Sequence, residues 1–214
     1  MAAAAPDPLS GEFQGLPPAL GGVRLYAQLK PDAAGLAELV RLQSAARVLT
    51  PRARPVSPGR LHLTLIHFGK ADEAYERLAA ATGVGPETFG RALGGYLAAT
   101  EASLPVRDFL LTPVGLAGFG INGSTLALEC SPTPELGEVH AVLYALVLEF
   151  LAACGVSDPA GYAAKDPALA FSAVLRPHIS ILHGFRLPTE DAAQMPVVSP
   201  EPLRLTPLPV LYRA

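Results

Sequence analysis

The sequence predicts an α+β fold with two similar halves, and three observations support this prediction. Strand-like segments, in which apolar and polar residues alternate, are interleaved with segments whose apolar residues recur at helical spacing. An eight-residue motif that begins with Arg occurs twice, at residues 60–67 and 176–183. Asn122-Gly123 separates two strand-like segments, which is typical of a β-hairpin. We therefore expect strands and helices to alternate within each half.

The first half is expected to follow an N-terminal tail. Residues 1–22 are rich in Ala, Pro and Gly without a steady period, which predicts a flexible tail, and Pro6 and Pro8 interrupt any signal peptide early. Residues 23–214 are expected to form one domain. Its first half should contain a strand at 23–29, a helix at about 31–47, a Pro-rich loop or edge segment at 50–59 and a strand at 61–68.

The second half follows two helical segments near residues 72–81 and 86–101. It should contain strands at 106–116 and 124–130, a long helix at 134–153, a loop at 155–170, a strand at 173–182 and a Pro-interrupted strand at 203–212. Because proline cannot donate a ladder hydrogen bond, we expect this last strand at a sheet edge. His140 lies within the long helix, where we expect it on the surface.

Composition describes a soluble globular protein rather than a membrane protein or a coat for nucleic acid. The chain has 214 residues, of which 50% are apolar, and a net charge of -3. This apolar fraction argues against disorder, and the charge argues against binding a long polyanion through bulk electrostatics. The longest apolar runs, such as 141–148, are shorter than the roughly 20 residues that a membrane span needs. Cys130 and Cys154 are expected to be buried thiols in a reducing compartment.

The repeated motif is the most informative feature of the sequence. Its two copies read Arg-Leu-His-Leu-Thr-Leu-Ile-His and Arg-Pro-His-Ile-Ser-Ile-Leu-His. Because alternate residues of a strand share a face, the first Arg, the first His and the hydroxyl residue of each copy should point the same way. These residues are Arg60, His62 and Thr64 in the first copy, and Arg176, His178 and Ser180 in the second.

If the two polar faces oppose each other, they form a site for an anion. Two imidazoles, two hydroxyls and two guanidinium groups can all donate hydrogen bonds to phosphate oxygens. A pair of histidines can also accept a proton on one side of a substrate and deliver one on the other near neutral pH. A single His-x-Thr is common in strands of ordinary proteins. Two copies with Arg at the same offset favour a functional site.

The distribution of charge agrees with an anion site. No Asp or Glu occurs between Leu39 and Ala71, or between Pro167 and Thr189, whereas eight Lys and Arg residues do. The rest of the chain has a net charge of −11. A phosphate would be repelled least near the two motifs.

Two His-x-Thr/Ser motifs on strands resemble the signature of the 2H phosphoesterase superfamily, and most closely the bacterial RNA 2′,3′-cyclic phosphodiesterases, also called 2′-5′ RNA ligase-like proteins. The resemblance covers about Val23 to Tyr212, including the opening strand and helix, the Gly-rich segment after Phe109 and the helix before the second motif. It implies two pseudo-symmetric lobes, each an antiparallel-rich sheet with helices on its outer face. The active-site cleft would lie between them, with one motif from each lobe.

The resemblance also implies an activity. His62 and His178 would be the catalytic acid–base pair, and Thr64 and Ser180 would bind phosphate oxygens. The reaction would be hydrolysis of 2′,3′-cyclic phosphates of RNA ends or nucleotides to 2′-phosphates, with 2′-5′ RNA ligation as its reverse. It would need no metal and no cofactor. We expect a cytoplasmic monomer whose partner is an RNA end or a small nucleotide, without a membrane association.

The chain departs from this branch at two positions. Relatives often carry Arg five residues after the second catalytic His, where this chain has His183, and an aromatic residue at the position of His67. Simple alternation puts both histidines on the face opposite the motif, unless a β-bulge changes their direction. His67 and His183, like Arg60 and Arg176, are therefore candidates either for substrate contact or for supporting the site. The missing Arg bears on ribonucleotide specificity more than on the phosphodiester chemistry.

Two other functions compete with this interpretation. One is a 2H enzyme that acts on another small cyclic nucleotide or on an ADP-ribose-type phosphodiester. The other is a non-catalytic nucleotide-binding module, although a pure binder needs no paired acid and base. The spacing Gly118-Phe-Gly-Ile-Asn-Gly123 matches a dinucleotide-binding loop, but a strand rather than a helix is expected after it, which disfavours that function. No pattern typical of a zinc site or of a nucleophile elbow is present.

Overall fold

A computed structural model of the chain describes residues 21–186, 195–208 and 211–213. Nearly all of the expected tail, residues 1–20, therefore lies outside the described residues. The strands are β1 (Val23–Pro31), β2 (Arg54–Pro55), β3 (Leu63–Lys70), β4 (Phe109–Leu111), β5 (Pro113–Phe119), β6 (Thr125–Cys130), β7 (His178–His183), β8 (Leu203–Leu208) and β9 (Leu211–Arg213). The helices are α1 (Ala33–Leu49), α2 (Ala71–Thr82), α3 (Pro86–Ser103), α4 (Pro134–Ala153) and α5 (Pro159–Lys165), with short 3-10 turns η2 (Pro58–Arg60), η3 (Ile121–Gly123) and η4 (Ala170–Ser172).

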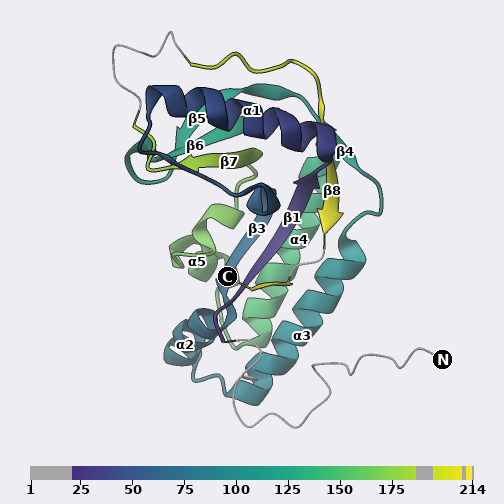
Figure 1. Cartoon of the computed structure of the whole chain (residues 1–214). Helices are drawn as coiled ribbons and strands as arrows, with labels where there is room; N and C mark the ends of the chain where they lie inside the picture. Colours follow the sequence, from purple (N-terminus) through teal and green to yellow (C-terminus); the bar gives the residue numbers. More distant parts are fainter. Residues whose placement is uncertain (1–20, 187–194, 209–210, 214) are drawn as a thin grey trace, which may run out of the picture.

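The strands form one antiparallel sheet that consists of two halves. Its order is β4-β8-β1-β3-β7-β6-β5, with β2 beside β7 and β9 beside β1. The two motif strands, β3 and β7, join the halves through a single residue pair, Leu63 and Ile179. The predicted α+β fold with antiparallel sheets and flanking helices is confirmed (Figure 1).

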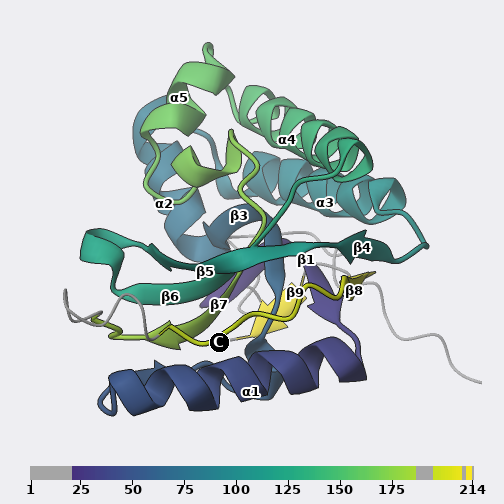
Figure 2. The same cartoon turned by 90° about the horizontal axis from the view of Figure 1, so that it is seen from above.

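The helices lie on both sides of the strands. Figure 2 shows α1 on one side, and α2, α3, α4 and α5 on the other. Helix α1 contacts β1 and β8, which lie in one half of the sheet, and also β7 of the other half of the sheet. Helix α4 packs on β3 and α3. Each half of the chain thus contributes a helix that covers a motif strand of the other half, and the two motifs are fixed relative to each other.

Local signals explain where the helices and the hairpin begin. The Asp32 carboxylate accepts a hydrogen bond from the Gly35 N–H at the start of α1, and the Thr133 hydroxyl accepts one from the Leu136 N–H before α4. In the turn between β5 and β6, Asn122 has φ 55° and Gly123 has φ 66°, the left-handed conformation that these two residue types adopt most readily. The Gly-rich segment is therefore a hairpin turn and not a dinucleotide-binding loop.

Three details differ from the sequence prediction. The expected loop at 155–170 contains α5, whose first turn is capped by Asp158 and begins with Pro159. Strand β8 is not at the sheet edge but lies between β4 and β1. Its Pro207 pairs with β1 beyond the last residue that pairs with β4, so the missing N–H removes no ladder bond.

His140 is the third difference. It is 7% exposed rather than on the surface, and its Nε2 donates a hydrogen bond to the Ser172 carbonyl oxygen at 3.0 Å. Burial lowers the pKa of His140, so the ring is neutral near pH 7. His140 connects α4 to η4, just before the second motif strand.

Helix α4 is long and apolar enough to cross a membrane by length and composition. Its buried residues, which include Leu143, Val147 and Phe150, face the core. Phe150 packs against the rings of Phe68 and Tyr96. Within the described residues, one side of α4 thus packs into the core. The two cysteines are buried free thiols as expected.

Each motif strand contains a β-bulge at the same place. Leu65 is an extra residue in the pairing of β3 with β1, and Ile181 is an extra residue in the pairing of β7 with β6. These two residues are equivalent in the repeated motif. At each bulge two successive apolar residues are buried, so the strand resumes its alternation one residue later.

A buried glutamine stabilises the bulge in β7. The Gln43 Nε2 donates hydrogen bonds to the Ile181 carbonyl oxygen at 2.9 Å and to the Val56 carbonyl oxygen at 2.6 Å. The Val56 N–H also donates to the Ile181 oxygen, at 3.0 Å. The amide of α1 thus connects β7 to the segment that precedes η2.

We expect Gln43→Leu to lower the free energy of unfolding by about 1–3 kcal/mol, because it removes two hydrogen bonds to buried carbonyl groups. Ser44→Ala, at the exposed neighbouring position, should change stability by less than about 0.5 kcal/mol. Urea unfolding followed by circular dichroism measures both. Equal stability of the two variants would contradict a role for Gln43 at the bulge.

Candidate active site

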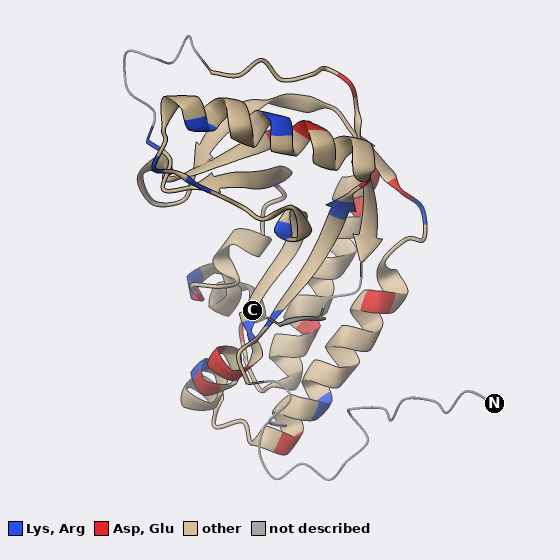
Figure 3. Ribbon diagram, in the orientation of Figure 1, with Lys and Arg blue, Asp and Glu red and all other residues tan. Residues whose placement is uncertain are grey.

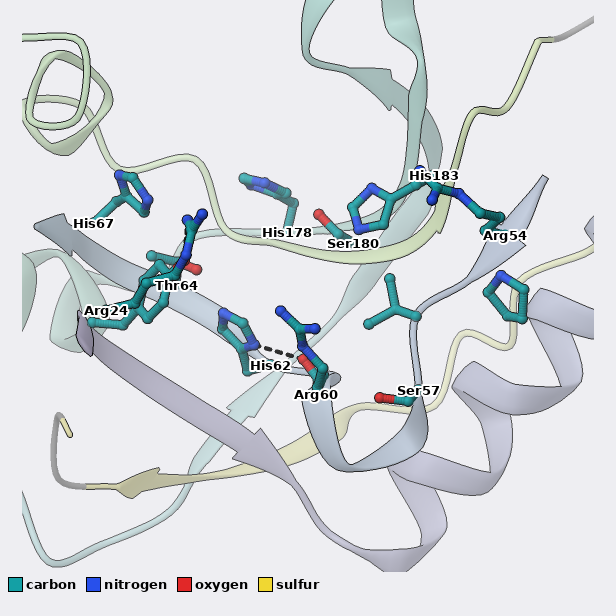
Figure 4. A pocket seen from close by; sticks show the side chains of 13 residues that line it. Arg24, Arg54, Ser57, Arg60, His62, Thr64, His67, His178, Ser180 and His183 are labelled. Carbon is teal, nitrogen blue, oxygen red and sulfur yellow. Dashed lines mark hydrogen bonds between the residues drawn. The ribbon is translucent and has the colours of Figure 1, made fainter. Parts of the chain in front are cut away.

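The two motifs face a cleft at the junction of the two halves (Figure 4). The cleft has a volume of about 680 Å³. None of the described residues that line it is acidic, and strands β3 and β7 carry no Asp or Glu (Figure 3). The lining residues are Arg24, Tyr26, Arg54, Pro55, Val56, Ser57, Arg60, His62, Thr64, His67, His178, Ser180 and His183. Seven of the eight residues singled out from the sequence are among them.

The two motif histidines have the same local geometry. The His62 Nδ1 lies 2.7 Å from the Arg60 carbonyl oxygen, and the His178 Nδ1 lies 2.7 Å from the Arg176 carbonyl oxygen. A carbonyl oxygen only accepts hydrogen bonds, so each Nδ1 carries a hydrogen. In the neutral ring, Nε2 is therefore the unprotonated nitrogen, as a proton acceptor requires. The Arg of each motif thus orients the histidine through its backbone.

The strand register places each histidine beside the hydroxyl of the other motif. Leu63 and Ile179 are directly paired, and the pairing is antiparallel. One step to either side therefore brings His62 opposite Ser180 and Thr64 opposite His178. The result is a pseudo-twofold arrangement of two imidazoles and two hydroxyls about the junction of β3 and β7.

The His62 ring is held in its neutral form. Burial lowers the pKa of His62 below its ordinary value, and the positive charges of Lys30, Arg60 and His178 lower it further, while the hydrogen bond to the Arg60 carbonyl acts in the opposite direction. Lys30 lies in β1 and donates hydrogen bonds to the Gly59 and Leu61 carbonyl oxygens at 2.6 and 3.3 Å. It therefore stabilises the turn that precedes His62 and also affects the electrostatics of the ring.

The bulges turn His67 and His183 into the cleft. Simple alternation would have put both on the opposite face, and the extra residues Leu65 and Ile181 reverse this. The His67 Nδ1 donates to the Ala168 carbonyl oxygen at 2.9 Å, and its ring lies 5.0 Å from the Tyr26 ring. His67 thus belongs to the cleft and also holds the segment that precedes η4.

His183 lies at the other end of the cleft. Its Nδ1 is 3.4 Å from the Thr125 hydroxyl, and it is paired with Arg54 across β2 and β7. An imidazole therefore lies next to an arginine from another strand at this end of the cleft.

Arg176 is the one candidate that does not line this cleft. Its guanidinium lies 4.8 Å from the centre of the Phe119 ring and 3.5 Å from the Glu129 carboxylate. The Phe119 ring stacks on His178 at 4.1 Å with an interplanar angle of 11°. Arg60 faces the cleft, so the two equivalent arginines have different environments.

Several residues of the site come from strands outside the motifs. Arg24 and Tyr26 are on β1, the antiparallel partner of β3, and Arg54 and Ser57 precede η2. Glu129 of β6 is paired with His178 and brings a carboxylate near the second motif. Alternation along Val23–Leu29 already put Arg24 and Tyr26 on one face, but only the pairing of β1 with β3 places that face in the cleft.

A second, more apolar pocket of about 590 Å³ adjoins the cleft. Thr64, His67, His178 and Ser180 line both. Phe119, Phe171, Val174 and Leu175 provide apolar surface on its far side, and Phe171 is 79% exposed. The site thus has a polar, cationic part and an apolar, aromatic part on either side of the two histidines.

Within the described segments, no group of three or more His, Cys, Asp and Glu side chains is arranged to hold a metal ion. The groups that the cleft offers are imidazoles, hydroxyls and guanidinium groups. These can bind an oxyanion directly.

Comparison with known proteins supports the fold. No family model matches the chain, and no curated protein sequence does. Among solved structures, TT0787 of Thermus thermophilus is similar, with a TM-score of 0.52 and 19% identity over 88% of this chain and 82% of that one. This similarity shows a shared fold.

Two further solved structures match this chain with lower TM-scores. One is described as a phosphoesterase, with a TM-score of 0.47 and 17% identity over 87% of this chain and 96% of that one. The other is E. coli LigT in its apo form, with a TM-score of 0.46 and 16% identity over 87% of this chain and 95% of that one.

Proposed function

We propose that the protein is a 2H-type phosphodiesterase that hydrolyses 2′,3′-cyclic phosphates of RNA ends or nucleotides to 2′-phosphates. The observation that supports this most strongly is the matched pair of histidines. Both have Nδ1 bound to a carbonyl oxygen, and each lies beside the hydroxyl of the other motif. A site that only bound phosphate would need donors, but not two rings in the tautomer that leaves Nε2 unprotonated when the ring is neutral.

In the proposed mechanism His62 is the general base. Its lowered pKa keeps Nε2 unprotonated near pH 7. Nε2 accepts a proton from water as the water oxygen attacks phosphorus. The bond from phosphorus to O3′ breaks, and His178 in its protonated form donates the Nε2 proton to O3′. The products are a free 3′-hydroxyl and a 2′-phosphate monoester, and the proton count balances.

Thr64 and Ser180 stabilise the transition state in this scheme. Their hydroxyls can donate to the two non-bridging phosphate oxygens, on which negative charge increases as water adds. The described lining residues include no Asp or Glu, which keeps the cleft favourable for that charge. 2′-5′ RNA ligation would use the same groups with the 5′-hydroxyl of a second RNA in place of water. This hydroxyl would attack phosphorus and lose its proton to His62, the bond to O3′ would break with proton donation from His178, and a 2′-5′ phosphodiester would form.

The adjoining apolar pocket favours a nucleoside as the group attached to the phosphate. An exposed aromatic ring such as that of Phe171 can stack with any nucleobase. We expect Phe171→Ala to raise KM for a cyclic nucleotide about tenfold with little change in kcat, because stacking contributes to ground-state binding. Val48→Ala, on the exposed surface of α1, is the control. An unchanged KM in the Phe171 variant would argue against the binding of a nucleobase in the apolar pocket.

We also propose a compartment, an oligomeric state and a partner for the protein. We propose a cytoplasmic protein that acts as a monomer on an RNA end or a small nucleotide without metal or cofactor. Two buried free thiols fit a reducing compartment. Light scattering measures the oligomeric state directly.

The test is a turnover assay with a panel of diesters. Purified protein should open adenosine 2′,3′-cyclic phosphate to the 2′-phosphate in the presence of EDTA. It should do so faster than it hydrolyses adenosine 3′,5′-cyclic phosphate or a cyclic phosphate of ADP-ribose. Preference for the ADP-ribose compound would support the alternative substrate class. Binding of these nucleotides without any turnover would contradict the proposed phosphodiesterase activity and favour a nucleotide-binding module.

A further inference from the structure

The cleft extends beyond the catalytic centre to a second pair of basic side chains. Arg54 of β2 and His183 of β7 are directly paired across their strands, so their side chains share a face. Both line the cleft, and Figure 4 shows them close together on the far side of Ser180 from His67. We call Arg54 and His183 the distal pair.

This pair exists because of the bulge in β7. The extra residue Ile181 turns His183 to the cleft face, and Gln43 stabilises that conformation with two hydrogen bonds from a buried amide. Without the bulge, His183 would point to the opposite face, and Arg54 would have no imidazole beside it in the cleft. The buried Gln43 amide and the bulge at Ile181 thus place the His183 ring in the cleft.

Among the residues that the structure describes, no carboxylate forms an ion pair with the distal pair. Arg77, Arg107 and Arg204 each lie within 2.7 to 3.4 Å of an Asp or Glu oxygen. Arg54, in contrast, forms no ion pair within the described segments. A guanidinium directly opposite an imidazole that can become cationic is unfavourable in the absence of an anion. A bound anion would satisfy both groups.

The distal pair is too far from the catalytic centre to hold the same phosphate. His183 lies three residues beyond Ser180, and one of these is the bulge. A strand rises about 3.3 Å per residue, so the two positions are roughly 7–10 Å apart. One phosphate group does not span that distance, whereas two phosphates joined by a sugar do.

We propose that Arg54 and His183 bind a second phosphate of the substrate, separated from the cyclic phosphate by one ribose. This inference rests on the proposed function, since it takes the cyclic phosphate to lie at His62 and His178. The ligand chemistry is that of a phosphate at the 5′ position of the same nucleoside. It can come from a 5′-phosphorylated nucleotide or from the internal phosphodiester of an RNA end.

The test compares the binding of two inert ligands by isothermal titration calorimetry. The full chain should bind adenosine 2′,5′-bisphosphate about 10- to 100-fold more tightly than adenosine 2′-monophosphate, as expected for added charge-assisted hydrogen bonds. Arg54→Ala and His183→Ala should each remove most of this preference. Arg52→Ala removes the same charge two residues away, does not line the cleft and should keep the preference. Equal affinities in the wild type, or a full preference in Arg54→Ala, would overturn the inference.

Kinetics distinguishes the two sources of the second phosphate. The substrates are adenosine 2′,3′-cyclic phosphate, its 5′-phosphorylated form and a diadenosine dinucleotide that ends in the cyclic phosphate. A higher kcat/KM for the 5′-phosphorylated form alone supports a terminal phosphate, and a higher value for both supports an RNA end. No gain for either contradicts the inference. Absence of turnover for all three would contradict the proposed function, while the calorimetric comparison still tests the distal pair.

Discussion

Replacement of either His62 or His178 by alanine is expected to lower kcat on a 2′,3′-cyclic phosphate by about 10²- to 10⁴-fold, the contribution typical of a positioned acid or base. In each ring Nδ1 is hydrogen-bonded to a carbonyl oxygen, and Nε2 is the nitrogen that exchanges a proton in the proposed mechanism. Loss of either ring removes one of two proton transfers. The double variant should lose little more than the single ones, because the two residues act as a unit.

Asparagine at the same positions separates catalysis from folding. Its side-chain N–H can replace Nδ1 as the donor to the Arg60 or Arg176 carbonyl oxygen, but nothing replaces Nε2. His62→Asn and His178→Asn should therefore be as inactive as the alanine variants while keeping the melting temperature of the wild type. Activity close to that of the wild type in any of these variants would contradict the mechanism.

Removal of the two hydroxyls is expected to have the second largest effect. Thr64→Val and Ser180→Ala should each lower kcat by about 10- to 10³-fold, since each deletes one donor to an oxygen on which charge develops. The effect should appear in kcat more than in KM, because the charge is larger in the transition state than in the bound substrate. Steady-state kinetics on adenosine 2′,3′-cyclic phosphate measures both constants.

Conservative variants serve as controls for the hydroxyls. Thr64→Ser and Ser180→Thr keep the donor and should keep activity within about tenfold of the wild type. If Thr64→Val and Thr64→Ser had equal kcat, the hydroxyl would not contact the reacting phosphate. The pseudo-twofold arrangement also predicts similar losses at the two positions, because each hydroxyl lies opposite the histidine of the other motif.

Local pattern was sufficient to predict the repeated part of the site. Period-2 alternation placed Arg60, His62 and Thr64 on one face, and the structure shows all three in the cleft. The hairpin turn at Asn122-Gly123 and the long helix at 134–153 were also predicted, because turn chemistry and helical spacing are local properties.

The positions of the other side chains depend on tertiary contacts, which local sequence pattern does not predict. The direction of His183 depends on a bulge that Gln43 stabilises from α1, more than a hundred residues away in the chain. Arg24 lines the cleft because β1 pairs with β3. Arg176 lies outside the cleft because it contacts Phe119 and Glu129 of the β5–β6 hairpin. His140 is buried where the Ser172 carbonyl oxygen of η4 accepts a hydrogen bond from its ring. None of these partners is close in sequence.

The pH dependence of kcat/KM in the wild type and in the two alanine variants tests the histidine pair most directly. The wild type should give a bell-shaped profile. Activity should rise with pH as the base loses its proton, with a midpoint below about 6.5 because the pKa of His62 is lowered, and should fall at higher pH as the acid loses its proton. His62→Ala should lack the rising limb and keep the falling one, and His178→Ala should show the reverse. A profile with both limbs intact in either variant would contradict the assignment of His62 as base and His178 as acid.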